Sequence, residues 1–432
     1  MKIALLCLII CGTASAVIGQ NLTLNSVEEA LKQALQHNPD LQLYQLKRKQ
    51  AQLEHKSSRS HLLPTISGVI TAQRNIDLPV TPIPGEIFGQ PGRTIEAQFG
   101  QTYNYNVGLS LSKNLLDWQA TLKSRVVKIN MEMTEAQTAA FKQKLTEQVA
   151  LYYYTAIITK KALQINAQDV QLADSLFLLT QNKFRQGVTD QLAINQARMH
   201  IHQLRQTSIS NKILLNQCYQ QLKTLLGADT QATITITQTE ILSLPNNALP
   251  INMGQDKSLT TYALQSKQND LRVRMERAAY LPKLSLTTYL GRQQFSNEAT
   301  ISFDRWTSNS YIGLNLSIPI FTGFSRSNQV KIAKVAQQEA KLTWQQAQQK
   351  SALADATLLK EYQYTQELVQ ASQDNFRLAK ANAKLSFKRY QQGLINLEQY
   401  YRRFEDYLSA EQGYLSALSK LYGYQATIIS RK

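Results

Sequence analysis

Segments in which apolar and polar residues alternate occur at four places along the chain. The clearest covers 103–112, where every second residue from Tyr103 to Leu111 is apolar or aromatic and the residues between are Asn, Gly or Ser. Residues 284–291 and 309–320 show the alternation without a charged residue, and 65–74 shows it more weakly. A period of two is typical of β-strands. The pattern predicts four strands of about ten residues, which suits either a half-buried soluble sheet or tilted membrane-spanning strands.

A heptad pattern of apolar residues follows each pair of predicted strands. After the first strand pair, apolar residues recur at alternating intervals of four and three, at Leu122, Val126, Ile129, Met133, Ala136 and Ala140. After the second pair, alanine recurs every seven residues, at Ala333, Ala340, Ala347 and Ala354. This spacing is typical of helices that pack along a left-handed seam, where small residues allow a close approach.

Helix-breaking residues are rare in the same segments. No proline occurs from 92 to 244 or after 319, and Gly187 and Gly393 are each the only glycine in a long stretch. Such a stretch predicts an antiparallel helical hairpin with a tight tip. At 1.5 Å per residue the helices ending near these tips would be about 100 Å long. Helices of that length must pack against neighbours along their whole sides.

The chain contains two copies of this arrangement. Three short segments recur in the same order, 63–67 as 281–285, 107–112 as 312–317, and 183–187 as 389–393. Three matches in one order indicate a duplication. The sequence predicts a first repeat over 20–226, a mixed connector over 227–256 and a second repeat over 257–432. Each repeat would hold a helix, two strands and a long helical hairpin.

The segments that join the paired strands are predicted to be loops. Residues 74–101 contain four prolines, and 294–308 is shorter and polar. Four strands cannot close a barrel, because the smallest barrels need about eight, and lipid does not tolerate an open sheet edge. If the strands span a membrane, several chains must therefore share one pore. The candidates for an interfacial aromatic girdle are then Tyr103, Tyr105, Trp306 and Tyr311. Ordinary packing explains each of these aromatic residues equally well.

The start of the chain has the features of a secretory signal peptide, which we expect over 1–19. Lys2 supplies the positive charge, residues 3–10 form a short apolar core, and Ala14-Ser15-Ala16 has the small residues of a cleavage site. A lipoprotein signal would instead use Cys11, but the two isoleucines before it are bulkier than such signals normally have. We therefore expect an exported protein.

The chain is strongly basic, with a formal net charge of +17. Basic chains often bind nucleic acid, but export excludes that partner. Anionic lipid headgroups or an anionic content of a pore are the expected contacts. Beyond the signal the chain has no run of about 20 apolar residues, so no transmembrane helix is expected.

The sequence shows no catalytic or metal-binding constellation. It lacks the G-x-S-x-G, P-loop and H-E-x-x-H motifs. His200 and His202 are two residues apart on a predicted helix and do not share a face. Cys218 stays alone once the signal is removed, and its apolar helical surroundings favour a small buried side chain. We predict a protein that is not an enzyme and binds neither cofactor nor metal.

Motifs along the whole mature chain resemble those of the TolC-like outer membrane efflux family, the outer membrane factors. Residues 29–41 match the opening helix signature of that family, E-A-L-x-x-A-L-x-x-N-P-x-L. Leu63-Pro64 and Leu281-Pro282 before two of the strands, residues 316–321 at the end of the last strand, and the two glycine tips match as well.

The resemblance implies a mixed α+β membrane protein that forms a homotrimer in the outer membrane of a Gram-negative bacterium. Four strands per chain would form a shared 12-stranded β-barrel, and the internally duplicated helices would form a long α-helical coiled-coil barrel through the periplasm. Such a protein is the passive exit duct of a tripartite efflux or type I secretion system. Its partners would be a periplasmic adaptor, an inner-membrane transporter and outer-membrane lipid.

The resemblance also assigns roles to residues at the helical tips. The adaptor would dock at Phe184, Arg185, Gly187, Arg389, Tyr390 and Gly393. The candidates for lining the tunnel constriction are Asp190, Glu398, Gln399 and Arg402. Relatives carry aspartates shortly after the tip glycine, where this chain has Ala193 and Gln399. We therefore expect a less acidic constriction that carries a basic ring from Arg402 or Arg403, unless Arg402 points outward and pairs with Glu405.

A non-conducting coiled-coil scaffold of the cell envelope is the alternative function. It would explain the signal peptide and the helices, but not the four strands or the duplication. The cargo of a channel is not encoded in the duct alone, because drug, metal, polysaccharide and protein export all use such a part.

Overall fold

The computed structural model describes residues 22–89, 91–237 and 256–432. The expected signal peptide over 1–19 and most of the predicted connector lie outside the described residues. The chain divides into two compact units: the first takes residues up to 46, 136–259 and 347–432, and the second takes 47–135 and 260–346. Each unit therefore draws segments from both predicted repeats.

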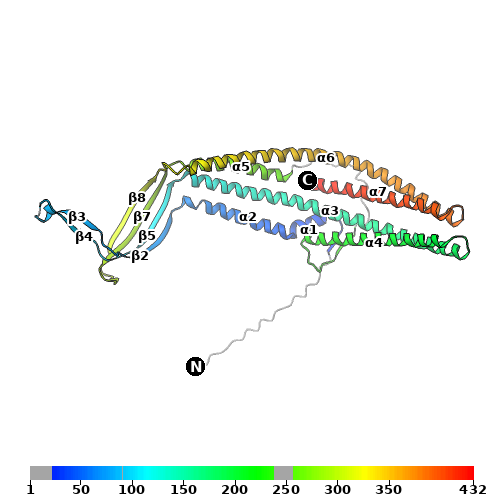
Figure 1. Cartoon of the computed structure of the whole chain (residues 1–432), viewed down its shortest axis with the longest axis horizontal. Helices are drawn as coiled ribbons and strands as arrows, with labels where there is room; N and C mark the ends of the chain where they lie inside the picture. The colour runs from blue at the N-terminus through cyan, green and yellow to red at the C-terminus, as the bar shows by residue number, and fades with distance from the viewer. Residues whose placement is uncertain (1–21, 90, 238–255) are drawn as a thin grey trace, which may run out of the picture. The chain divides into compact units, whose positions relative to one another are not determined.

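The second unit contains a four-stranded antiparallel sheet, visible with its strands labelled in Figure 1. Its order is β2 (Thr65–Arg74), β5 (Tyr103–Leu116), β7 (Lys283–Ser296) and β8 (Thr307–Ser317). The four strands are the four that the alternation predicts. The two halves of the chain meet at the pairing of β5 with β7.

The register of the sheet gives it one aliphatic and one polar face. Residues opposite each other in an antiparallel ladder share a face, and Leu109 lies opposite both Gly68 and Leu290. The same registers place a set of aliphatic side chains on that face: Ile66, Ile70, Val107, Leu109, Leu111, Leu286, Leu290, Ile312, Leu314 and Leu316. The other face carries mainly Thr, Ser, Asn and Gly. The aliphatic residues of all four strands therefore lie on the same face of the sheet.

The proline-rich segment between β2 and β5 is not a simple loop, so that expectation was wrong in part. It contains a second antiparallel pair, β3 (Val80–Pro84) and β4 (Thr94–Gln98), joined through a 3₁₀ turn at Gly85–Phe88. Pro82 and Pro84 both lie in β3, which pairs on one side with β4 within the described sheet. Proline is tolerated there because an edge strand leaves one row of N–H positions without a partner.

Two long helical hairpins follow the strand pairs, as the heptad pattern predicts. The first joins α3 (Trp118–Arg185) to α4 (Gln191–Leu226), and the second joins α6 (Ser325–Gln391) to α7 (Leu397–Ser430). The shorter helices are α1 (Val27–His37), α2 (Pro39–Ser58) and α5 (Lys257–Ala278), with a 3₁₀ turn at Ser60–Leu62. None of the helices in the described part of the chain has the length and apolar character that crossing a membrane requires.

The two heptad seams are buried to different extents within the chain. Val126, Ile129 and Ala136 of the first seam are 8%, 4% and 8% exposed. In the second seam Ala340 is 8% exposed, whereas Ala354 is exposed. The second seam thus has apolar positions that the chain itself leaves uncovered.

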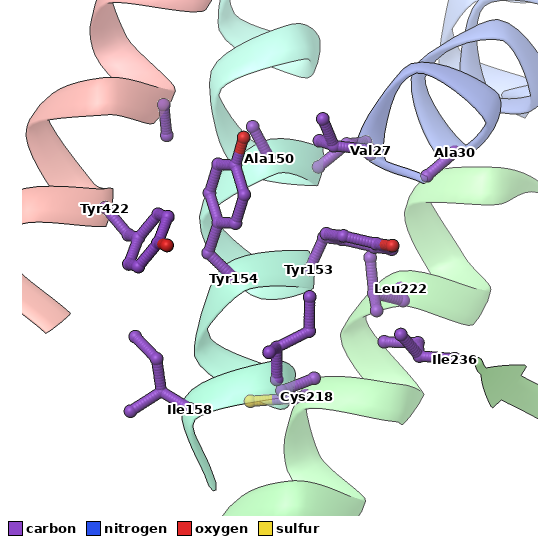
Figure 2. Close-up of a cluster of buried hydrophobic side chains, with 14 of the residues drawn as sticks. Val27, Ala30, Ala150, Tyr153, Tyr154, Ile158, Cys218, Leu222, Ile236 and Tyr422 are labelled. Carbon is purple, nitrogen blue, oxygen red and sulfur yellow. The ribbon is translucent and has the colours of Figure 1, made fainter. Parts of the chain in front are cut away.

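The core of the first unit lies where α1, α3, α4 and α7 meet a short parallel strand pair, β1 (Leu22–Leu24) and β6 (Ile234–Ile236). Figure 2 shows Tyr153 and Tyr154 of α3 inside this cluster. The rings of Tyr154 and Tyr422 are 4.7 Å apart between centroids. Cys218 is 2% exposed there, and burial raises the pKa of its thiol. This cysteine is a packed side chain, as its apolar surroundings predict.

Asn38 of the opening signature connects three helix ends. Its amide nitrogen donates to the carbonyl oxygen of Leu225 at 2.9 Å, and its amide oxygen accepts from the N–H of Leu41 at 2.9 Å. The side chain therefore caps the start of α2 and ties it to the last turn of α4. Gly227, which ends α4 with φ 65°, lies against the carbonyl group of His37. The two hydrogen bonds of Asn38 satisfy groups that helix ends leave unpaired, and the close approach at Gly227 leaves no room for a Cβ.

Two glycines allow β5 and β7 to approach closely. Gly108 and Gly291 are opposite each other in the ladder. A Cβ on Gly108 would lie 2.6 Å from the carbonyl oxygen of Leu290 and 2.7 Å from Cα of Gly291. Both neighbours are backbone atoms, so neither can move aside without distorting the strand pair. The aromatic ring of Tyr289 also lies against this position, 2.9 Å from such a Cβ.

We predict that Gly108→Ala weakens the pairing of β5 with β7. Overpacking against backbone atoms typically costs about 1–3 kcal/mol, so the detergent-solubilised protein should unfold at a lower temperature. Gly313→Ala is the matched control, because a Cβ at that glycine of β8 meets no atom within 4 Å. Equal unfolding temperatures for the two variants would contradict the prediction.

Candidate functional site

The two hairpin tips have the same backbone geometry. Gly187 and Gly393 adopt φ 73° and 76°, the left-handed region that favours glycine. In the first tip the N–H of Val188 donates to the carbonyl oxygen of Lys183 at 2.8 Å. In the second tip the N–H of Leu394 donates to the carbonyl oxygen of Arg389 at 2.9 Å. The glycine positions therefore mark equivalent turns, as the isolated glycines predict.

The helices that leave the tips begin with side-chain caps. A carboxylate oxygen of Asp190 accepts from the N–H of Ala193 at 2.9 Å. Asn396 accepts from the N–H of Gln399 at 2.8 Å, and the Gln399 side chain accepts from the N–H of Asn396 at 3.1 Å. Two of the four constriction candidates, Asp190 and Gln399, thus use side-chain oxygens to start α4 and α7.

A latch of Thr180, Lys183 and Tyr390 joins the two hairpins near their tips. The ammonium group of Lys183 on α3 donates to the carbonyl oxygen of Tyr390 on α6 at 2.6 Å. The same ammonium lies 3.9 Å from the centroid of the Tyr390 ring. The hydroxyls of Thr180 and Tyr390 are 3.3 Å apart. Partial burial lowers the pKa of Lys183, which is consistent with an ammonium group held against the partner hairpin.

An aromatic cluster backs this latch. Tyr400, Phe404 and Tyr407 on α7 are 0%, 1% and 3% exposed. Tyr390 lies 6.2 Å from Tyr400 between ring centroids, and Tyr400 lies 5.9 Å from Phe404. This cluster was not predicted from the sequence, although its spacing of four and three residues is the same heptad signal that predicts the other helices.

The residues expected at the docking tips differ in their accessibility. Phe184 is 39% exposed, and Arg185 and Arg389 are exposed. Tyr390 is 3% exposed. Its side chain therefore packs inside the latch, and the accessible surface of the tips comes from its neighbours.

The charged constriction candidates form ion pairs along α7. The guanidinium of Arg402 lies 2.6 Å from the carboxylate of Glu398, and that of Arg403 lies 3.2 Å from Asp406. Arg402 thus pairs with Glu398 rather than with Glu405. The hydrogen bond from Arg402 to Glu398 raises the pKa of the guanidinium. Both pairs are on the exposed surface, where a single pair adds little stability.

The four aromatic girdle candidates do not share one face of the sheet. Tyr103 and Tyr105 lie in phase with Leu109, on the aliphatic face, and their rings are nearly parallel with centroids 6.3 Å apart. Tyr311 lies opposite Tyr289 on the polar face, with centroids 5.8 Å apart. Trp306 directly precedes β8 and is half-buried. The alternation in the sequence already assigns Tyr311 to the polar set.

Comparison with known proteins identifies the group to which these features belong. The family model for outer membrane efflux proteins matches residues 30–228 and 253–428. The cation efflux system protein CusC of Escherichia coli K12 is 23% identical over 346 residues, which cover 78% of this chain and 71% of CusC. The probable efflux pump outer membrane protein TtgC of Pseudomonas putida KT2440 is 22% identical over 398 residues, 87% of this chain and 78% of TtgC.

Solved structures show the same fold. The crystal structure of the Campylobacter jejuni CmeC outer membrane channel superimposes with a TM-score of 0.76 at 19% identity, over 94% of this chain and 85% of CmeC. At this level of identity the similarity establishes the α+β, mostly helical fold, and the functional residues have to be argued from this chain.

We predict that Lys183→Met loosens the tip. The variant removes one hydrogen bond and one cation–π contact, each typically worth about 1 kcal/mol. Amide hydrogens of the 389–394 turn should then exchange roughly ten times faster, the factor that corresponds to about 1.4 kcal/mol.

Lys388→Met is the matched control, because Lys388 is an exposed lysine two residues from Tyr390. Unchanged exchange at the 389–394 turn in Lys183→Met, or an equal increase in both variants, would show that the latch does not hold the tip.

Proposed function

The chain belongs to the outer membrane efflux protein family, and we propose that it is the trimeric outer-membrane channel of a tripartite efflux or type I secretion system. Members of this family are outer-membrane efflux components of Gram-negative bacteria. Within the proposal, the chain supplies a passive duct and a docking surface, and its partners supply the energy. The observation that carries it is the four-stranded sheet with one aliphatic face and two open edges.

The open edges argue for a shared barrel. β2 and β8 each pair with one strand in the described sheet. The aliphatic face suits lipid, but lipid does not tolerate unpaired backbone groups. Pairing β2 of one copy with β8 of the next satisfies both edges, and three copies then give twelve strands around one pore. Closed cyclic symmetry of this kind is common in homo-oligomers.

The two faces of the sheet would then have separate tasks. The aliphatic face would contact lipid, with Tyr103 and Tyr105 at its edge, where aromatic side chains favour the membrane interface. The polar face would line a wetted lumen with Asn104, Asn106 and Ser110, and Tyr311 would stand there rather than in the girdle. An alternating wall of this type conducts polar solutes without binding them strongly.

The hairpin tips would dock the periplasmic adaptor. Phe184, Arg185 and Arg389 supply accessible apolar and basic groups at the turns of Gly187 and Gly393. The latch and the buried cluster behind them join the two hairpins, so a partner that displaces these contacts can separate the tips. A shift of packed helices of this kind is a common form of conformational switch.

Conduction by trimers tests the proposal. The purified full-length protein should migrate as a trimer after chemical cross-linking, and it should give discrete conductance steps in planar lipid bilayers. Lys183→Met should conduct more than the unmodified protein, because loosening the latch favours the open tip. An elongated dimer, or the absence of conductance from both proteins, would support the non-conducting scaffold instead.

We further propose that Arg402 lowers the cation selectivity of the constriction. Symmetry would place three copies of the Glu398–Arg402 pair around the tunnel, and Arg402→Gln would leave three uncompensated carboxylates. The expected result is a several-fold rise in the cation-to-anion permeability ratio, measured from the reversal potential in a salt gradient. Electrostatic effects of this kind weaken at high ionic strength.

Arg377→Gln is the matched control, because Arg377 forms an exposed ion pair with Asp374 on α6 at 3.0 Å. A channel that is strongly cation-selective before and after the Arg402 change would refute the basic ring.

A further inference from the structure

A cavity of about 530 Å³ lies between α3, α4 and α7 in the first unit. Much of its wall is apolar, including Ile158, Leu204 and Leu214. Two acidic side chains also line it, Asp169 from α3 and Glu411 from α7. They are 4% and 8% exposed. Buried carboxylates are costly unless they are paired, protonated or coordinated, so this pair requires a partner.

Asp169 and Glu411 are within hydrogen-bonding reach of each other. The hydroxyl of Tyr407 donates to Oδ1 of Asp169 at 2.8 Å. Oδ2 of Asp169 and Oε2 of Glu411 are buried without a hydrogen-bond partner. No Lys, Arg or His in the described part of the chain forms an ion pair with either carboxylate. Lys380 on α6 acts on both from a greater distance.

A third oxygen points to a ligand independently of the acids. Asn166 lies one helical turn before Asp169, lines the same cavity and is 4% exposed. Its amide nitrogen donates to the carbonyl oxygen of Leu204 at 3.1 Å, which fixes the orientation of the amide. Its amide oxygen is buried without a hydrogen-bond partner. A buried acceptor of this kind normally has a donor or a cation.

The charge state of the pair is set by burial. Loss of solvent raises the pKa of Glu411 to about 8, and burial also raises the pKa of Asp169. Tyr400 and Tyr407 of α7 face the same carboxylates, and burial raises the pKa of both phenols. The residues of α4 at the cavity, Leu204, Thr207, Asn211 and Leu214, carry no titratable group. Burial therefore disfavours two bare carboxylates side by side at this cavity.

We propose that Asp169, Glu411 and Asn166 form a site for a hard divalent cation such as Ca²⁺. The donor set consists of oxygen atoms, which suits Ca²⁺ or Mg²⁺ rather than Zn²⁺ or copper. No third His, Cys, Asp or Glu completes a metal-ligand group in the described part of the chain. The amide oxygen and water molecules in the cavity therefore complete the coordination shell.

A bound divalent cation would compensate the charge of the two buried carboxylates. It would bridge α3 to α7 behind the aromatic cluster of the tips, so it should stabilise the packing of the two hairpins.

Calorimetric titration of the full-length protein in detergent with CaCl₂ tests the site. One ion per chain should bind at pH 7, as read from the stoichiometry of the titration. The absence of any heat of Ca²⁺ binding would overturn the proposal.

Two variants separate this site from adventitious binding. Glu411→Gln keeps the shape of the side chain and its hydrogen bond to Asp169 but removes the negative charge. Its affinity for Ca²⁺ should therefore fall at least tenfold. Asp174→Asn is the matched control, because Asp174 is a half-exposed carboxylate five residues along α3 that pairs with Arg205 at 3.7 Å. It should bind Ca²⁺ as the unmodified protein does.

Thermal unfolding guards against a folding defect in the Gln variant. Ca²⁺ should raise the unfolding temperature of the unmodified protein and of Asp174→Asn, and leave that of a folded Glu411→Gln unchanged. Equal Ca²⁺ binding by all three proteins would assign the ion to the surface and refute the site. The absence of both Ca²⁺ and Mg²⁺ binding by the unmodified protein would refute the site as well.

Discussion

The backbone N–H and C=O groups along the outer edges of β2 and β8 have one strand partner fewer than those of β5 and β7 in the described sheet. In water such an edge is a modest liability, but in lipid each unpaired group costs several kcal/mol. On the aliphatic face of the same sheet, Ile70 and Leu314 are 84% and 68% exposed in the described part of the chain. That face therefore suits lipid, and the edges then require other copies of the sheet. Much of the proposed architecture depends on this one requirement, since it converts a four-stranded sheet into part of a larger closed wall.

The long helices present a related problem. The described part of the chain leaves apolar positions of the second seam uncovered, as at Ala354. Neighbouring copies would cover them along the length of the helices. At the tips specific contacts join the two hairpins: the Lys183 ammonium against Tyr390, and the buried cluster behind it, to which both hairpins contribute. An opening tip would break these contacts without unfolding the hairpins, because the helices continue far beyond it.

Polar groups buried in the first unit are handled in two different ways. Asn38 uses both ends of its amide to close helix termini, which explains physically why an Asn-Pro pair opens α2. Asp169 and Glu411 have no such backbone partners and rely on each other and on Tyr407. The first arrangement is complete within the chain and gives rigidity. The second leaves buried oxygens of Asn166, Asp169 and Glu411 without a hydrogen-bond partner, which makes the site responsive to what enters the cavity beside them.

Local patterns in the sequence were sufficient for the strands, the hairpins and the tips, because strand alternation, heptad spacing and isolated glycines act through neighbouring residues. The caps at Asp190 and Asn396 follow the same local logic. The β3–β4 pair was not predicted, because prolines normally argue against a strand. They are compatible with an edge strand, but the sequence does not show which strand lies beside it. Tyr390 contacts Lys183 in the latch, and Asp169 contacts Glu411 of the other hairpin. Each of these contacts joins residues more than 200 positions apart in the sequence. Only tertiary packing decides such contacts, since they depend on which faces of distant helices meet.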